Sequence, residues 1–129
     1  MSESEIQSAI NKLPKLTYFG LGLDRNGPEL TSAEYKEAIK SSQKDLLNQL
    51  EGFDKCCAWL ENVEKSSSIN HKHSSSGLSR MIESDNDSTL NGIFIAAAIH
   101  SGFKFKTRKG SPNLHFNMSE ESISKLSKA

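Results

Sequence analysis

Apolar residues recur at helical spacing near the start of the chain. The first predicted helix covers residues 4 to 13 and stops at Pro14, which cannot continue a helix. Its apolar positions, at the i, i+3, i+4, i+7 spacing, are Ile6, Ala9, Ile10 and Leu13. The pattern therefore predicts that one face of a short N-terminal helix is buried.

A second, longer amphipathic helix is predicted from Thr31 to about Glu64. Thr31 and Glu34 have the spacing of a capping box, which marks the start of a helix. Behind this cap the apolar positions form a heptad-like seam, made by Leu46, Leu50, Phe53, Cys57 and Leu60. The seam either packs on its own domain or pairs two copies as a homodimer. Gly52 costs about 1 kcal/mol relative to alanine inside a helix, so a break within residues 51 to 53 is an open alternative.

The pattern changes after this helix. Residues 65 to 76 (KSSSINHKHSSS) are polar, Ser-rich and aperiodic, and are predicted to be a linker. Apolar residues at helical spacing then predict a short helix over residues 76 to 84. Residues 90 to 101 predict a helix that is apolar on all sides and ends at Gly102, so we expect it in the middle of a core.

A β-hairpin is predicted near the C-terminus, because residues 103 to 108 and 114 to 118 alternate with period two around a turn. One face would pack against small alanines of the preceding helix and holds Phe103, Phe105, Leu114, Phe116 and Met118. The other would face solvent and holds Lys104, Lys106, Arg108, His115 and Asn117. Residues 119 to 129 form either a short polar helix or a frayed tail.

These elements define an α+β fold with four parts. The parts are a helical region (residues 1 to 64), the linker (65 to 76), a helix-turn-helix-hairpin module (77 to 118) and the tail (119 to 129).

Charge is distributed unevenly along the chain. Its 16 basic and 16 acidic residues sum to zero. Residues 1 to 64 hold 7 basic and 11 acidic side chains (net −4), whereas residues 65 to 118 hold 7 basic and 3 acidic ones (net +4). All four histidines, His71, His73, His100 and His115, lie in the positive part. Neutrality therefore does not exclude a polyanionic partner, although such a modest charge predicts weak, easily screened binding.

Two parts of the positive region are candidates for DNA contact. The two helices with the hairpin as a wing resemble a winged helix-turn-helix, but the second helix offers almost no polar side chain to read base edges. Readout would then fall to Ser79 and Arg80 on the preceding helix. Alternatively, the hairpin contacts phosphates as a β-ribbon. The predicted nucleic-acid contacts are Arg80, Lys104, Lys106, Arg108 and Lys109; on the hairpin, lysines favour backbone contact over base reading, and a solvated strand face is the alternative.

Catalytic, metal and membrane signatures are missing from the sequence. Adjacent Cys56 and Cys57 diverge by about 100° on a helix, and neither C-x2-C, H-x3-H nor G-x-S-x-G occurs. We therefore expect no enzyme activity, no cofactor and no metal. The longest apolar run, residues 93 to 99, is far shorter than the roughly 20 residues that cross a bilayer. The acidic start lacks the features of a secretory signal, so a cytoplasmic location is expected.

Several segments together resemble a known family. They are His73-Ser74-Ser75-Ser76-Gly77-Leu78-Ser79-Arg80-Met81-Ile82-Glu83, Asn91-Gly92-Ile93-Phe94-Ile95-Ala96-Ala97-Ala98, Gly102-Phe103, Ser111-Pro112-Asn113 and Phe53-Asp54-Lys55-Cys56-Cys57-Ala58-Trp59-Leu60. This pattern, over roughly residues 45 to 118, is similar to small uncharacterised proteins carried by plasmids, phages and integrative elements. Where that family has Ser-Tyr-Gly-Leu-Lys-His, this chain has Ser76 at the tyrosine and Ser79-Arg80 in place of Lys-His. The resemblance implies a setting, mobile DNA in a bacterial cytoplasm, and no activity.

Two hypotheses follow from the sequence. The first is a small accessory or regulatory protein of a mobile element that binds DNA weakly through the basic hairpin and the adjacent helix, as a dimer through the seam. The second is a protein-binding module without affinity for nucleic acid, whose seam or hairpin docks a host or element-encoded protein.

Overall fold

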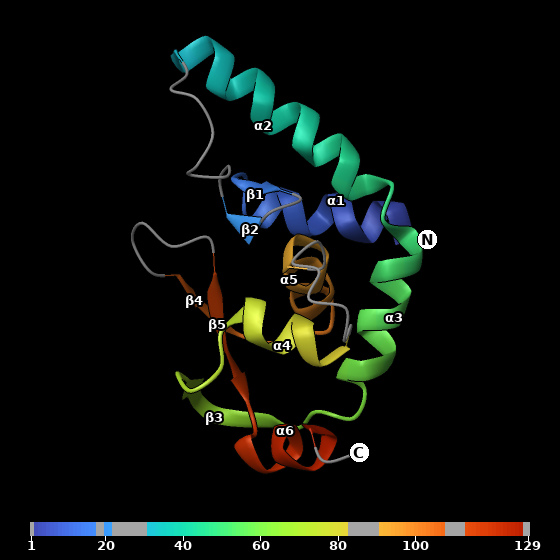
Figure 1. Cartoon of the computed structure of the whole chain (residues 1–129), viewed down its shortest axis with the longest axis vertical. Helices are drawn as coiled ribbons and strands as arrows, with labels where there is room; N and C mark the ends of the chain where they lie inside the picture. Colours follow the sequence, from blue (N-terminus) through green and yellow to red (C-terminus); the bar gives the residue numbers. More distant parts are fainter. Residues whose placement is uncertain (1, 18–19, 22–30, 83–90, 108–112, 128–129) are drawn as a thin grey trace.

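The computed structural model describes residues 2–17, 20–21, 31–82, 91–107 and 113–127 (Figure 1). The helices are α1 (Ser2–Lys12), α2 (Ser32–Leu47), α3 (Leu50–Leu60), α4 (Ser75–Ile82), α5 (Asn91–His100) and α6 (Glu120–Ser127). The strands are β1 (Leu16–Thr17), β2 (Gly20–Leu21), β3 (Lys65–Asn70), β4 (Phe105–Thr107) and β5 (Leu114–Met118). The predicted α+β class is confirmed.

Helix α5 occupies the centre of the core, as its sequence predicts. Every residue from Asn91 to Ile99 is buried, and only His100 is exposed. Helices α1, α3 and α4 pack against α5, which leaves its apolar surface no contact with water. Gly102 ends the helix with a φ of 89°, a left-handed conformation that glycine adopts without steric cost.

The predicted hairpin is confirmed and forms part of a larger sheet. Strands β4 and β5 pair in the antiparallel register Phe105↔Phe116, Lys106↔His115 and Thr107↔Leu114. Strand β3 pairs with the other side of β5, which gives the strand order β3-β5-β4. The turn of the hairpin lies outside the described residues.

Aromatic contacts join this sheet to the helices. Phe116 of β5 meets Phe94 of α5 edge-on, with ring centroids 6.1 Å apart. The other side of Phe94 meets Trp59 of α3 at 6.0 Å. These edge-to-face contacts link α3, α5 and β5 into one core.

The prediction of a linker over residues 65 to 76 is wrong. Residues 65 to 70 form β3, and α4 begins at Ser75. An edge strand is held by backbone hydrogen bonds to its neighbour, so serines suffice there. The register of β3 on β5 shifts between Lys65 and Asn70, which removes the regular alternation by which a strand is recognised. A single cluster of buried residues includes Phe53 and Phe116, so the core continues across this segment.

The long helix is also divided differently from the prediction. Helix α2 ends at Leu47 and α3 begins at Leu50, so the break falls at Asn48 and Gln49, whereas Gly52 lies inside α3. The N–H of Asn48 donates to the carbonyl of Asp45 at 3.2 Å, and the N–H of Gln49 donates to the carbonyl of Leu46 at 3.0 Å, which closes the last turn of α2. The capping box at the start of α2 is confirmed.

The predicted dimer seam is mostly buried inside the chain itself. Leu46, Phe53 and Leu60 have almost no exposed surface, Cys57 is half-buried, and only Leu50 is exposed, at 40%. Because the chain changes direction between α2 and α3, Leu46 on α2 and Phe53 and Leu60 on α3 all reach the same core. The seam therefore serves mainly as a core face of the chain itself, and the homodimer stays a prediction.

Two smaller expectations concern the ends of the chain. Residues 120 to 127 form a helix, α6, and the Ser119 hydroxyl accepts a hydrogen bond from the N–H of Ser122 at 3.3 Å, as a helix cap does. In the part of the chain that the structure describes, no helix has the length and apolar character needed to cross a membrane.

Leu46→Ala should lower the free energy of unfolding by about 2–5 kcal/mol, because it leaves a cavity in the core. Leu50→Ala, four residues along the same predicted seam, should change it by less than about 0.5 kcal/mol because Leu50 is exposed. Urea unfolding followed by Trp59 fluorescence measures both. Equal losses would contradict the division of the seam into buried and exposed positions.

Candidate nucleic-acid interface

The sheet has an inner face that packs against α4 and, through Phe116, against α5, and an outer face turned away from them. Leu114 and Phe116 are buried on the inner face. Because side chains alternate along a strand, His115 lies on the outer face, and its register partner Lys106 lies beside it. Lys104 and Lys106 are exposed and His115 is half-buried. We call the surface formed by His71, Lys104, Lys106, His115 and Asn117 the outer face.

His71 extends this surface across the third strand. The pairing of Asn70 with Phe116 places the next residue, His71, opposite His115. The two imidazole rings have centroids 5.4 Å apart and are tilted by 44°. His71, His115 and Lys106 therefore form one row across the sheet, with His115 in the middle.

The buried side-chain amide of Asn117, next to His115 along β5, bonds to the chain on both sides of β5. The Asn117 side-chain oxygen accepts a hydrogen bond from the N–H of Lys104 at 2.6 Å, and its NH₂ donates to the carbonyl of Ser66 at 3.1 Å. Asn117 thus connects β5 to both neighbouring strands. It was expected to face solvent, but it is buried, because its amide completes backbone hydrogen bonds that the irregular register leaves open.

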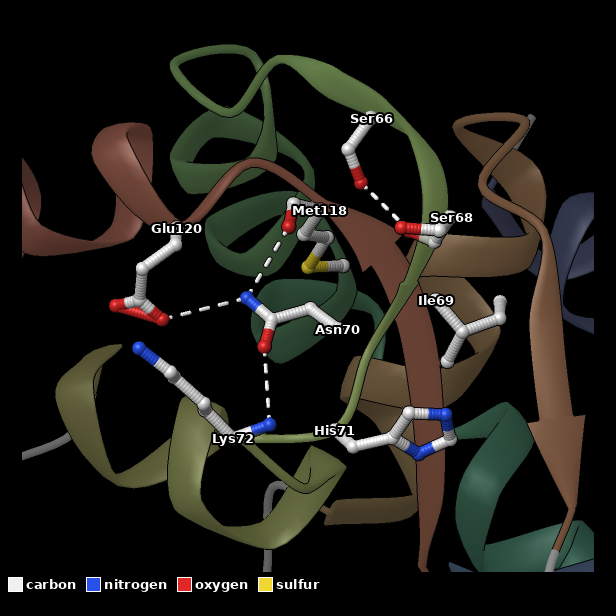
Figure 2. Close-up of a pocket in the computed structure, with 8 residues that line it drawn as sticks. All are labelled: Ser66, Ser68, Ile69, Asn70, His71, Lys72, Met118 and Glu120. Carbon is white, nitrogen blue, oxygen red and sulfur yellow. Dashed lines mark hydrogen bonds between the residues drawn. The ribbon is translucent and has the colours of Figure 1, made fainter.

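A shallow hollow of about 490 Å³ lies between β3, the turn after it and the start of α6 (Figure 2). Glu120, which lines this hollow, accepts several hydrogen bonds. The carboxylate accepts from His73 Nε2 at 2.9 Å, from the Asn70 amide at 3.4 Å and from the Ser124 hydroxyl at 3.3 Å. Figure 2 shows the His71 ring turned away from this cluster.

The same contacts keep Glu120 ionised. The hydrogen bond from His73 lowers the pKa of Glu120 below its ordinary value of 4.5, and the Asn70 hydrogen bond and the charges of His73 and Lys72 act in the same direction. The carboxylate is therefore bound by Asn70 and His73, on either side of the turn between β3 and α4. These hydrogen bonds hold that turn, which includes His71, against the start of α6.

The structure separates the residues predicted to contact nucleic acid. Lys104 and Lys106 lie on the outer face as predicted. Arg80 is exposed on α4, a helix that packs against α5 and not on the outer face. Arg108 and Lys109 lie outside the described residues.

The helix-turn-helix interpretation is corrected at two points. Ser79, expected to reach bases, is buried and donates to the carbonyl of Ser76 at 2.9 Å. Helix α5, which would be the recognition helix, is enclosed by the rest of the fold and cannot enter a groove.

Sequence reasoning missed His71 and Lys72 as neighbours of the hairpin. Both lie in the segment interpreted as a linker, so nothing placed them in a sheet. The pair of histidines in His71-Lys72-His73 was a signal, but only the register of β3 shows that His71 faces His115 and His73 faces Glu120.

Cys57, His100 and Glu5 lie near one another, and their contacts do not activate the thiol. Cys57 is half-buried, and burial, followed by the nearby Glu5 and Asp54 carboxylates, raises its pKa to about 11. A thiol attacks only as the thiolate, so this thiol is not activated. His100 Nε2 lies 3.7 Å from a Glu5 oxygen, and its ring packs on Phe53 at 5.6 Å. Within the described residues, no three His, Cys, Asp or Glu side chains are arranged to hold a metal ion.

Comparisons with known proteins add nothing to this geometry: no protein-family model matches the sequence, and no significant match was found among curated proteins or solved structures. Any function must therefore be argued from the chain's own residues.

Glu120→Gln should make the free energy of unfolding less dependent on pH below about pH 4.5. Because the pKa of Glu120 is lower in the folded chain, its ionised form stabilises the fold above about pH 4.5, and this contribution is lost as the pH falls through the folded-state pKa. Unfolding in urea from pH 7 to pH 3 measures the effect, which we expect to be under about 1 kcal/mol because the group is partly exposed. Glu121→Gln is the control, since Glu121 makes only an exposed pair with Lys125 at 3.5 Å. An identical pH profile for both variants would contradict the role of Glu120.

Asn117→Ala should cost about 1–3 kcal/mol of unfolding free energy, because two backbone groups lose their partner in a buried place. Asn62→Ala is the matched control, since its amide makes one exposed hydrogen bond of 3.4 Å to the carbonyl of Ala58. Thermal or urea unfolding compares the two. A loss no larger than that of Asn62→Ala would show that Asn117 does not hold the strands together.

Proposed function

We propose that the outer face binds the phosphate backbone of duplex DNA without base specificity. The observation that supports this most directly is that the exposed Lys106 of β4, and the exposed Lys104 just before that strand, lie beside the row of His71 and His115. Neighbouring cationic side chains on an exposed surface suit the closely spaced negative charges of a nucleic-acid backbone.

The charge of the surroundings supports the same proposal. Within the described residues, the outer face holds no carboxylate. Glu120, at the start of α6, is engaged by His73 and Asn70 and is turned away from His71. A phosphate approaching the outer face therefore meets positive or neutral groups first.

The absence of base specificity follows from the residues available. Lysine is a point charge and lacks the two-pronged geometry with which arginine reads a guanine edge. Two arginines were predicted to contact DNA. Arg80 is the one within the described residues, and it lies on α4 and not on this face. The binding should therefore be weak and set by salt concentration.

The setting that we propose, an accessory or regulatory protein of a bacterial mobile element, comes from the sequence resemblance. The competing role, a protein-binding module that docks through the seam or the hairpin, loses most of its first surface, because the seam is largely buried in this fold.

Fluorescence anisotropy with a labelled generic duplex at two salt concentrations tests the proposal. We expect a dissociation constant of about 10⁻⁶ M or weaker, with a log–log salt slope of roughly −3 to −4 if about four phosphates are contacted. Lys104→Ala with Lys106→Ala should weaken binding and reduce the slope by about 2, since each removed contact reduces it by about 1.

The matched control is Lys40→Ala with Lys44→Ala. It removes the same charge from α2, where both lysines are exposed and far from the outer face in the fold (Figure 1). This pair should leave the affinity nearly unchanged. Equal losses from both pairs, or no binding of the wild type at low salt, would overturn the proposal.

A further inference from the structure

The turn between β3 and α4 carries a cation that the proposed phosphate contacts do not include. Lys72 is exposed and directly follows His71, which belongs to the outer face. Its backbone is fixed, because its N–H donates to the side-chain oxygen of Asn70 at 2.9 Å. Its side chain lines the hollow beside β3 and points toward the Glu120 carboxylate (Figure 2). The turn therefore directs the His71 ring onto the outer face and the Lys72 ammonium group into the hollow.

Glu120 attracts the charge of Lys72 in addition to the side chains that donate to it. His73 donates to the carboxylate at 2.9 Å and the Asn70 amide donates to it at 3.4 Å. The hydrogen bond from His73 lowers the pKa of Glu120 most, and the charge of Lys72 lowers it further. Because Coulomb attraction is mutual, Glu120 in turn holds the Lys72 ammonium group in the hollow.

This hold on Lys72 is weak enough for another anion to break. The Glu120 side chain is 40% exposed, so water and salt screen its attraction for Lys72. Phosphate oxygens accept the same charge-assisted hydrogen bonds from an ammonium group as carboxylate oxygens do. The four-carbon stem of lysine is flexible. A DNA phosphate at the outer face can therefore replace Glu120 as the partner of Lys72.

We propose that Glu120 is an internal competitor for phosphate, which holds Lys72 away from the DNA that the outer face binds. The inference rests on the proposed function and specifies how that contact is limited. Lys72 is a further phosphate contact, and it becomes available only when Glu120 releases it. DNA binding and the attraction between Lys72 and Glu120 therefore oppose each other.

The next residue of α6 offers a matched control. The Glu121 carboxylate pairs with Lys125 at 3.5 Å, and both side chains are exposed. Glu121→Gln removes the same charge from the same helix and leaves the contacts of Glu120 in place. Glu120→Gln keeps a side-chain oxygen that can accept from His73 and Asn70, so it removes the charge and retains acceptors for the turn.

The experiment is an anisotropy titration of the full chain with the labelled generic duplex at two salt concentrations and neutral pH. Glu120→Gln should tighten binding about 2- to 5-fold, because the attraction between two exposed charges is worth at most about 5-fold. It should also steepen the log–log salt slope by about 1, because one more phosphate is contacted. Glu121→Gln should leave both quantities nearly unchanged.

A double-mutant cycle tests whether the effect acts through Lys72. When Glu120→Gln is combined with Lys72→Ala, it should no longer tighten binding or steepen the slope, because the ammonium group that it would release is gone. Far-UV circular dichroism verifies that each variant is folded.

The outcomes separate the two proposals. Equal gains from Glu120→Gln and Glu121→Gln, or a gain that survives Lys72→Ala, would overturn the inference and leave DNA binding in place. Unchanged or weaker binding by Glu120→Gln would overturn it in the same way. Binding by Glu120→Gln and not by the wild type would support the restraint and overturn the proposed function. No binding by the wild type or by any variant would overturn both.

Discussion

The burial of α5 is the constraint on which the rest of the structure depends. A helix that is apolar on all sides has to be covered on all sides, and in this chain α1, α3, α4 and the short strands β1 and β2 pack on it, while Phe116 of β5 contacts Phe94. The contact of Phe94 with Phe116 makes the sheet part of that cover, and the contact of Phe94 with Trp59 makes α3 another part. The N-terminal helices and the C-terminal sheet therefore share a core, although the charge pattern divides the sequence into two halves.

This constraint also decides which surfaces remain for function. It encloses α5, so the helix that a helix-turn-helix protein would place in a DNA groove is unavailable, and it buries most of the seam that could have joined two copies. The inner face of the sheet is occupied as well. The outer face stays exposed, and there the alternation that buries Leu114 and Phe116 turns His115 outward and aligns it with Lys106 and His71. The proposed binding surface is thus a consequence of the same packing that makes the core.

The elements with strong periodicity could be predicted from the sequence, and those held mainly by backbone pairing could not. The all-apolar pattern of α5, the Thr31–Glu34 cap and the alternation around the hairpin each have one physical solution, and the fold adopts it. Strand β3 has no such pattern, because its serines are held by β5 and by the buried amide of Asn117. The missed strand is why His71 and Lys72 were absent from the predicted site. A break in the long helix was left open at residues 51 to 53, but its position at Asn48 and Gln49 could not be predicted, because it depends on how Leu46 and Phe53 reach one core.

The most direct test of this account is to map where DNA touches the folded protein. In a titration of ¹⁵N-labelled protein with a generic duplex at low salt and pH 6, the account predicts that the amide resonances of His71, Lys72, Lys104, Lys106 and His115 shift most. Those of α5 and of the exposed part of α2 should shift little. Shifts centred on α2 or α1, or spread evenly over the molecule, would contradict the claim that the outer face of the sheet is the binding surface.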